Sequence, residues 1–328
     1  MAAKMYYEDA ADLSIIRGKK VAIIGYGSQG HAHALNLKDS GVSVKVGLPA
    51  ASRSRDKARA AGLEVVDVAD AAKWADVVMI LTPDHSQGKM YRDEIEPNLR
   101  QGAALGFSHG LAVHFGLLKP RPDLDVYLVA PKGPGTALRA LYQAGKGMVA
   151  LWAVAQDSTG SATGIALAYG QAIGCARAGL IASSFEEEAV ADLFNENAVV
   201  WGGVPELLRA GFETLVEAGI APEVAYMECV GELKLIADLI DARGIAGMRE
   251  VISNTAELGA VLGGPAVIDP AIREKMAVVL ESVRSGAFAK TLRSEAENGY
   301  PKLRAARNAA RSLPIEQVYE RLKKLSED

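Results

Sequence analysis

The feature that most restricts the fold of this chain is a glycine-rich turn between an apolar run and a helix-forming stretch. The run Lys20–Ile24 enters a turn that consists of Gly25, Tyr26, Gly27, Ser28, Gln29 and Gly30. In a G-x-G-x-x-G turn the first glycine permits a tight bend, the second lets the backbone approach a pyrophosphate, and the third allows close helix packing. The free amides at the start of the helix then face the phosphates. The sequence therefore predicts a dinucleotide-binding unit here, although a tight turn without a ligand has the same outline.

Short apolar runs alternate with helix-forming stretches over the first half of the chain. The predicted strands lie near residues 20–24, 42–47, 64–66, 76–82, 103–107, 125–130, 148–155 and 177–181. This alternation predicts an α/β fold of the Rossmann type with a doubly wound parallel sheet. Helices alone are predicted beyond it, over residues 185–199, 204–218, 222–243, 247–260, 270–284, 286–297 and 314–325. We therefore expect a nucleotide-binding domain at residues 1–183 and an all-α domain at residues 184–328.

The loop after the second predicted strand indicates which nicotinamide cofactor the turn would hold. An acidic residue near the end of that strand would bind the ribose hydroxyls of NAD, and the run Val42–Leu48 contains none. The loop instead contains Ser52, Arg53, Ser54 and Arg55, where the 2′-phosphate of NADP would lie. Arginine forks match phosphate oxygens, so NADPH is favoured over NADH. A solvated basic loop is the simpler alternative.

Polar residues also follow three later strands, at the edge where open α/β sheets bind ligands. They are Thr82, Pro83, Asp84, His109, Lys132 and Gly135. We assign the first three and Gly135 to the cofactor site. His109 can be a ligand-facing residue or a loop histidine with a satisfied hydrogen bond. Lys132 lies among glycines and prolines that fix its loop, and a lysine there can orient acidic groups or carry protons.

Two pairs of carboxylates lie four residues apart in the helical half of the chain. The first pair is Asp192 and Glu196, and the second is Glu228 and Glu232. A spacing of four places both side chains of a pair on one helix face, and their apolar neighbours favour a protected position. Like charges this close need neutralisation, and four hard oxygen donors suit Mg²⁺ or Mn²⁺ rather than zinc. An acidic helix surface is the alternative.

Composition narrows the class of partner. The chain has 328 residues, a net charge of −4 and 49% hydrophobic residues, which is typical of a globular protein of two domains. No basic patch suggests nucleic acid, and no window has the roughly 18 to 20 apolar residues that span a membrane. Cys175 and Cys229 fit no metal or redox spacing. The N-terminus lacks the apolar segment of a leader, so we expect a cytoplasmic protein with a small-molecule substrate.

Taken together, the motifs resemble those of ketol-acid reductoisomerases in the short form found mainly in bacteria. They are GYGSQGHA from Gly25, SHG from Ser108, APKGPG from Ala130, DLFNE from Asp192, AGFETLVEAG from Ala210 and ECVGELKL from Glu228. The resemblance runs nearly end to end and includes PIEQ from Pro314. It implies a Rossmann domain, a knotted helical C-terminal domain and an obligate homodimer or higher homo-oligomer. It also implies two Mg²⁺ ions between subunits, held by Asp192 and Glu196 of one chain with help from Glu228 and Glu232 of the other.

The resemblance further implies a reaction and roles for residues. The family shifts an alkyl group in 2-acetolactate or 2-aceto-2-hydroxybutyrate and then reduces the product with NADPH, which yields a 2,3-dihydroxy acid for branched-chain amino acid biosynthesis. Glu232 and Lys132 would handle protons, and His109 would position the nicotinamide or the proton network. Ser253 would hold the substrate carboxylate, with Ala256 beside it.

The chain departs from the family pattern around the expected substrate site. The departures are Thr136, Ala182, Asn195, Asn197, Trp201, Gly231 and Leu258. Trp201 replaces a small cysteine in the expected pocket, and its indole would block or reshape that pocket. A second hypothesis is therefore a paralogue that reduces another ketone or imine without migration, in a specialised pathway. A third is a nucleotide-binding regulatory protein without catalysis, which the four retained carboxylates disfavour.

Overall fold

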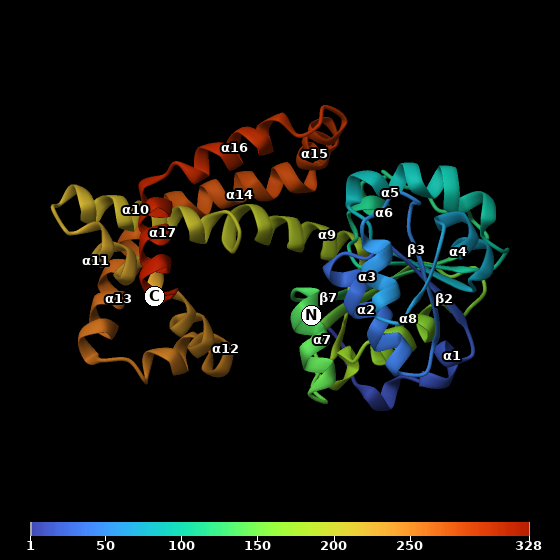
Figure 1. Ribbon diagram of the computed structural model, residues 1–328. Helices are drawn as coiled ribbons and strands as arrows, with labels where there is room; N and C mark the ends of the chain where they lie inside the picture. The colour runs from blue at the N-terminus through green and yellow to red at the C-terminus, as the bar shows by residue number, and fades with distance from the viewer. Residues whose placement is uncertain (1, 328) are drawn as a thin grey trace. The chain divides into compact units, whose positions relative to one another are not determined.

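The first half of the chain forms a nine-stranded sheet with helices on both faces (Figure 1). The structure, a computed structural model, describes residues 2–327. The strands are β1 (Met5–Tyr6), β2 (Lys20–Ile24), β3 (Ser43–Gly47), β4 (Glu64–Val66), β5 (Val77–Ile80), β6 (Ala104–Phe107), β7 (Asp125–Pro131), β8 (Ala150–Gln156) and β9 (Leu180–Ala182). Their order is β1-β9-β8-β7-β6-β5-β2-β3-β4. The chain order reverses outward from β2, as in a doubly wound fold.

The predicted doubly wound sheet is confirmed, but it is mixed rather than wholly parallel. Strand β8 runs antiparallel to β7, with Pro131 opposite Ala150, and β1 runs antiparallel to β9. The reason is the connection between β7 and β8, which is helix α7 (Gly135–Gln143) and a short loop. This connection brings the chain back to the edge from which it left, so no crossover to the far edge occurs. The remaining neighbours pair in parallel.

The helices of the first half cover two separate hydrophobic cores. They are α1 (Leu13–Arg17), α2 (Ser28–Asp39), α3 (Ser54–Ala60), α4 (Val68–Trp74), α5 (Asp84–Met90), α6 (Leu111–His114), α7 and α8 (Ala162–Ala172), with short turns η1 (Glu8–Ala10), η2 (Tyr91–Ile95), η3 (Glu96–Asn98) and η4 (Cys175–Arg177). Alternate residues of β2 enter different cores: Ile23 packs with helices α2 and α8, and Ile24 packs with α4 and η2. A strand buried on both faces reads as a continuous apolar run, which is why the sequence located it correctly.

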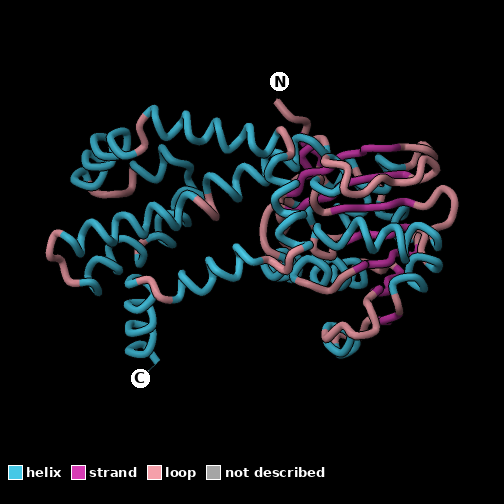
Figure 2. The backbone as a smooth tube through the Cα atoms, turned by 90° about the horizontal axis from the view of Figure 1, so that it is seen from above, coloured by secondary structure: helices cyan, strands magenta, loops and turns pink. Residues whose placement is uncertain are grey.

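The rest of the chain is helical, and strands appear only in the first half among the described residues (Figure 2). The elements are α9 (Phe185–Phe194), η5 (Asn195–Val199), α10 (Gly203–Glu217), α11 (Pro222–Tyr226), η6 (Met227–Gly231), α12 (Leu233–Arg249), α13 (Asn254–Val267), α14 (Pro270–Arg284), α15 (Ala287–Glu297), α16 (Pro301–Arg311) and α17 (Pro314–Glu327). The chain forms two compact units, one up to Ala191 and one from Asp192 onward. Within residues 2–327 no helix is both long and apolar enough to span a bilayer.

Two helix predictions in this half were wrong. The helix predicted at 247–260 is divided, because Ser253 takes an extended conformation and caps α13 by accepting a hydrogen bond from the Ala256 amide at 3.1 Å. Helix α16 was not predicted. Its apolar face consists of Leu303 and alanines, and all its residues are exposed, so its pattern in the sequence is weaker than that of a helix with several large apolar side chains.

Candidate functional site

The glycine turn has the close contacts that a nucleotide-binding turn requires. Gly25 has φ +103°, and a Cβ there would lie 2.7 Å from the Leu81 carbonyl oxygen. A Cβ on Gly30 would lie 2.3 Å from the Gly25 oxygen, so α2 packs directly against the turn. In contrast, nothing lies within 4 Å of a Cβ built on Gly27. The backbone is therefore open at the one glycine where a pyrophosphate would approach.

The loop after β3 presents fewer cations than its sequence suggested. Arg55 Nη1 donates to the Leu48 carbonyl and to Asp67 Oδ1, both at 2.7 Å, so this guanidinium holds the loop together. The Ser54 amide donates to Ser52 Oγ at 3.3 Å. Arg53 is exposed and precedes helix α3. The expectation of two arginines for a 2′-phosphate is thus corrected to one, Arg53, beside the two serines.

The carboxyl end of β5 leads into a half-buried polar turn. Thr82 and Pro83 lead into helix α5, which begins at Asp84. Gln87 Nε2 donates to the Thr82 carbonyl at 2.9 Å and to Asp84 Oδ1 at 3.2 Å. Burial raises the pKa of Asp84, the charge of His109 opposes that shift, and the negative charge of Glu188 adds to it. Asp84 therefore lies close enough to His109 and Glu188 for their charges to affect its pKa.

Those residues converge on one buried carboxylate, Glu188 of helix α9. Lys132 Nζ donates to Glu188 Oε1 at 2.9 Å, and His109 Nδ1 lies 2.9 Å from Oε2. The Gly110 amide also donates to Oε2 at 2.6 Å. A Cβ on Gly110 would lie 2.2 Å from the Phe185 oxygen, so only glycine lets this loop approach the start of α9. The structure thus brings together the predicted residues His109 and Lys132.

Glu188 is ionised in this setting. Burial alone would raise the pKa of its carboxyl, but the hydrogen bonds and charges of His109 and Lys132 lower the pKa to about 2. Its side chain is only 1% exposed. A buried charge persists when it is paired and hydrogen-bonded in this way. Glu188 therefore holds a fixed negative charge that orients both partners.

Sequence reasoning missed Glu188. It is the last residue of an acidic run, Glu186 to Glu188, that opens helix α9 and looks like ordinary charge at a helix start. The one available signal was its spacing, because Glu188 lies four residues before Asp192 and so extends the pair of carboxylates on one face. Its lysine and histidine partners are 56 and 79 residues away in the sequence.

One carboxylate that was predicted to bind metal, Asp192, lies beside this cluster. Single ligand atoms of His109, Glu188 and Asp192 all lie within 4.8 Å of one another. Asp192 is half-buried, whereas Glu196 is exposed. Glu228 and Glu232 are also exposed in the single chain. The expectation of a protected position therefore holds in part for Asp192 and is wrong, within one chain, for the other three.

Both carboxylate pairs lie at π-helical turns. Glu196 belongs to η5, in which the Val200 amide donates to the Asn195 carbonyl five residues back at 3.0 Å. Glu228 belongs to η6, and Glu232 directly follows it. Wide turns of this kind are uncommon and recur at functional sites, because they redirect side chains out of the regular helix. A regular α-helix, as predicted over 185–199 and 222–243, describes these segments less well.

The residues expected at the substrate are on the surface of the second unit. Ser253 and Ala256 are exposed at the start of α13, where the serine hydroxyl serves as the helix cap. The Trp201 side chain is 71% exposed, although it is the largest apolar group in its segment. Trp201 follows the π-helical segment η5 by two residues, in the turn before α10.

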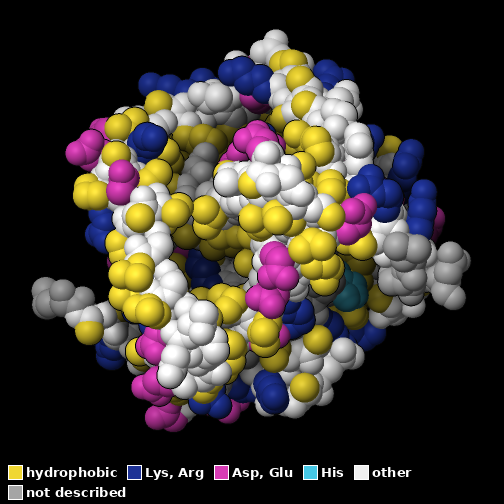
Figure 3. Space-filling view, turned by 90° about the vertical axis from the view of Figure 1, so that its left-hand side faces the viewer, with side chains coloured by type: hydrophobic (Ala, Val, Ile, Leu, Met, Phe, Trp, Pro, Cys, Tyr) yellow, Lys and Arg dark blue, Asp and Glu magenta, His cyan; other side chains and the backbone are white. Residues whose placement is uncertain are grey.

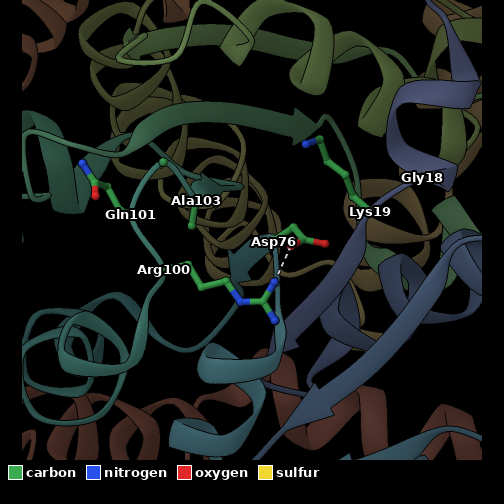
Figure 4. A pocket seen from close by; sticks show the side chains of 7 residues that line it. Gly18, Lys19, Asp76, Arg100, Gln101 and Ala103 are labelled. Atoms are coloured by element: carbon green, nitrogen blue, oxygen red, sulfur yellow. Dashed lines mark hydrogen bonds and ion pairs between the residues drawn. The ribbon is translucent and has the colours of Figure 1, made fainter.

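A pocket at the opposite edge of the sheet has a different character. Lys19, Asp76, Arg100 and Gln101 line it at the amino ends of β2, β5 and β6 (Figure 4). Arg100 Nη1 pairs with Asp76 Oδ1 at 2.9 Å across it. Because open α/β sheets bind their ligands at the carboxyl edge, this pocket is not the candidate active site.

Comparisons with known proteins cover the whole chain. Residues 15–179 match the family model described as the NADPH-binding domain of acetohydroxy acid isomeroreductase, and residues 185–328 match the C-terminal domain of ketol-acid reductoisomerase. A protein of Mycolicibacterium smegmatis (strain ATCC 700084 / mc(2)155) named ketol-acid reductoisomerase (NADP(+)) is 52% identical over 325 residues, which are 99% of this chain and 96% of that protein.

Solved structures agree with this result. The structure of an NADH-preferring ketol-acid reductoisomerase from an uncultured archean has a TM-score of 0.95 and 43% identity, and the match covers 98% of this chain and 99% of that chain. A semialdehyde dehydrogenase NAD-binding protein from Cupriavidus necator has a TM-score of 0.60 at 20% identity, over 81% of this chain and 99% of that chain. The second similarity concerns the fold alone.

Proposed function

The chain belongs to the ketol-acid reductoisomerase family, and from that premise we propose that it rearranges and reduces a 2-acetolactate-like substrate with NADPH. The product is a 2,3-dihydroxy acid of branched-chain amino acid biosynthesis. The observation that carries the proposal is the cluster of Lys132, Glu188 and His109 at the carboxyl edge of the sheet. That edge also carries the glycine turn, so a hydride donor and proton-handling groups belong to one site.

The cofactor site fits NADPH. The open backbone at Gly27 accommodates a pyrophosphate, and the start of α2 supplies free amides for its charge. Ser52, Arg53 and Ser54 offer two hydroxyls and one guanidinium for a 2′-phosphate. Thr82, Pro83, Asp84 and Gly135 complete the rim of the site. The 52%-identical relative is named for NADP(+), and the archaeal structure is titled NADH-preferring, so specificity is a property to measure in this chain.

The metal site would hold Mg²⁺ through Asp192 and Glu196, together with Glu228 and Glu232 of a second copy. The donor set fits this ion, because carboxylate oxygens are its preferred protein ligands. Ligand atoms of Asp192, Glu188 and His109 also lie within 4.8 Å of one another, which is a spacing that a metal ion can bridge. When bound, Mg²⁺ would polarise the oxygens of the substrate as a Lewis acid.

The protein's own groups would handle the protons. Lys132 Nζ donates a hydrogen bond to the ionised Glu188, so a fixed carboxylate aims this proton donor. His109 shares the other oxygen of Glu188, which sets the orientation of its ring beside the cofactor edge. Glu232, exposed in one chain, is the second candidate for proton transfer.

We assign the substrate contacts to the second unit. Ser253 would bind the substrate carboxylate through its hydroxyl, with Ala256 beside it at the start of α13. The exposed indole of Trp201 would contribute an apolar wall of the substrate site. An indole at this place would leave room for small alkyl groups and restrict larger ones.

A homodimer is the assembly that the surface of the second unit supports. Hydrophobic side chains gather on its outer face (Figure 3). Large apolar residues of α12 and α13 are exposed in the single chain: Leu235 58%, Ile245 61%, Leu258 61%, Leu262 67% and Val267 58%. Exposed large apolar side chains in this number favour an association site. A second copy of the chain would cover it and complete the metal site.

The test is NADPH oxidation with Mg²⁺ against 2-acetolactate and, separately, against 3-hydroxy-3-methyl-2-oxobutyrate, which is already rearranged. Turnover of both substrates is the expected result. Turnover of the rearranged compound alone would indicate a reductase without alkyl migration. Failure on both, with NADPH still bound, would contradict the proposal.

A further inference from the structure

The glycine turn and the loop that carries Lys132 touch through one side chain. Gln29 Nε2 donates to the Gly133 carbonyl at 2.8 Å, across 104 residues of sequence. The two backbones also meet closely, since a Cβ on Gly135 would lie 2.0 Å from the Ser28 oxygen. The loop at residues 131–135 therefore rests on the turn at residues 25–30.

Helices α2 and α7, which begin at these two loops, are linked along their length. Arg139 of α7 donates to Asn36 Oδ1 at 2.8 Å and pairs with Asp39 at 2.7 Å. The hydroxyls of Ser40 and Tyr142 lie 2.8 Å apart further along. The two helices thus move as one body, and Gln29 is the link at the end nearest the chemistry.

Two hydrogen bonds of Lys132 also hold this loop. The Lys132 amide donates to the Val149 carbonyl at 2.9 Å, which ties the loop to the start of β8. Lys132 Nζ is held by Glu188 at 2.9 Å. Between Pro131 and Pro134, Gln29 fixes the orientation of the Gly133 carbonyl and thereby the conformation of the loop.

We propose that Gln29 is a positioning residue that couples occupancy of the nucleotide turn to the placement of Lys132. Its backbone lies in the turn that would bind the pyrophosphate, and its amide holds the lysine loop. A nucleotide that orders residues 25–30 would therefore also order residues 131–135. Coupling of this kind is reciprocal, so a loosened lysine loop would also weaken the ordering of the nucleotide turn at residues 25–30. The inference rests on the proposed function for the role of Lys132, but the contact itself does not.

The first test is hydrogen exchange of the peptide that covers residues 129–138, with and without NADPH, in the full-length protein. The variant is Gln29→Met, which keeps the length of the side chain and removes the donor. We expect exchange at this peptide to rise about twofold to tenfold, the equivalent of one net hydrogen bond. We also expect NADPH to slow exchange at this peptide in the native chain and to lose that effect in the variant.

The matched control is Gln171→Met. Gln171 lies in α8, and its Nε2 is 3.5 Å from the Glu8 carbonyl, also far along the chain and away from the turn. The control should leave exchange at residues 129–138 unchanged. Should Gln29→Met fail to fold by circular dichroism, Gln29→Glu serves instead, because a carboxylate cannot donate to the Gly133 carbonyl.

The second test separates positioning from direct cofactor contact. With the rearranged substrate, Gln29→Met should lower kcat about twofold to tenfold and change the NADPH dissociation constant less than threefold. A weaker NADPH affinity with unchanged kcat and unchanged exchange would overturn the proposal, and so would exchange at 129–138 that is insensitive to NADPH in the native chain. If the native chain turns over neither substrate, the proposed function fails, while the exchange experiment still decides the coupling.

Discussion

Replacing Glu188 by glutamine removes the one charge that three groups share. In the native chain Lys132 Nζ, His109 Nδ1 and the Gly110 amide all lie within 2.9 Å of its carboxylate oxygens. Glutamine retains the shape and one acceptor oxygen but has no negative charge, so Lys132, whose side chain is 34% exposed, loses its buried counter-ion. Because water still reaches Lys132, the cost lies toward the low end of the roughly 3 to 5 kcal/mol for breaking a fully buried pair.

The pKa of Glu188 provides a second measure of the same effect. A shift from the ordinary value of 4.5 to about 2 corresponds to about 3 kcal/mol in favour of the folded state when the group is ionised. Because the folded pKa is lowered, this stabilisation is present above pH 4.5 and is lost as the pH falls through 2. The native chain should therefore exceed Glu188→Gln in free energy of unfolding by about 3 kcal/mol at pH 7, and the difference should shrink below pH 4.5.

Urea unfolding in the presence of a metal chelator measures this difference. A Trp201→Phe background leaves Trp74 and Trp152, both in the first unit, as the fluorescent reporters. The matched control is Glu187→Gln. Glu187 is exposed and its carboxylate accepts a hydrogen bond from the Ser183 hydroxyl, so a change within about 0.5 kcal/mol is expected. Equal stability of Glu188→Gln and the control at pH 7 would refute the account of Glu188 as a shared counter-ion.

Three further predictions concern other parts of the molecule. His33 is fully buried against the Tyr169 hydroxyl, and burial lowers its pKa to about 3. The native chain should therefore lose about 2 kcal/mol of stability between pH 7 and pH 5, because the unfolded state takes up a proton there. In urea titrations His33→Gln should reduce this dependence of stability on pH. Arg53→Ala should weaken NADPH binding roughly tenfold to a hundredfold and leave NADH binding unchanged in fluorescence titrations; an equal effect on both would exclude a 2′-phosphate contact. Leu262→Glu should shift the protein from dimer to monomer in analytical ultracentrifugation, whereas a persistent dimer would place the interface elsewhere.

Several features could be read from the sequence because their causes are local. The turn at residues 25–30 needs glycine for its positive φ and close contacts, so the pattern identifies both its structure and its ligand class. Central strands such as β2 are buried on both faces and appear as apolar runs. The change to helices near residue 184 likewise follows from periodicity alone. The family resemblance, which the comparisons confirm, also indicates the type of reaction.

Other features depend on where distant segments meet, and no local pattern encodes that. The antiparallel β8 follows from the path of α7, and an apolar run does not specify the direction in which it pairs. In the sequence Arg55 resembles a phosphate ligand, whereas in the structure it donates a hydrogen bond to Asp67. In the sequence Glu188 resembles a solvated acidic residue at a helix N-terminus, whereas in the structure it contacts Lys132 and His109. The glycine turn, the strands and the family are thus encoded locally in the sequence. The ion pairs of Glu188 and of Arg55 depend on the tertiary structure, because they form only when side chains from distant segments come into contact.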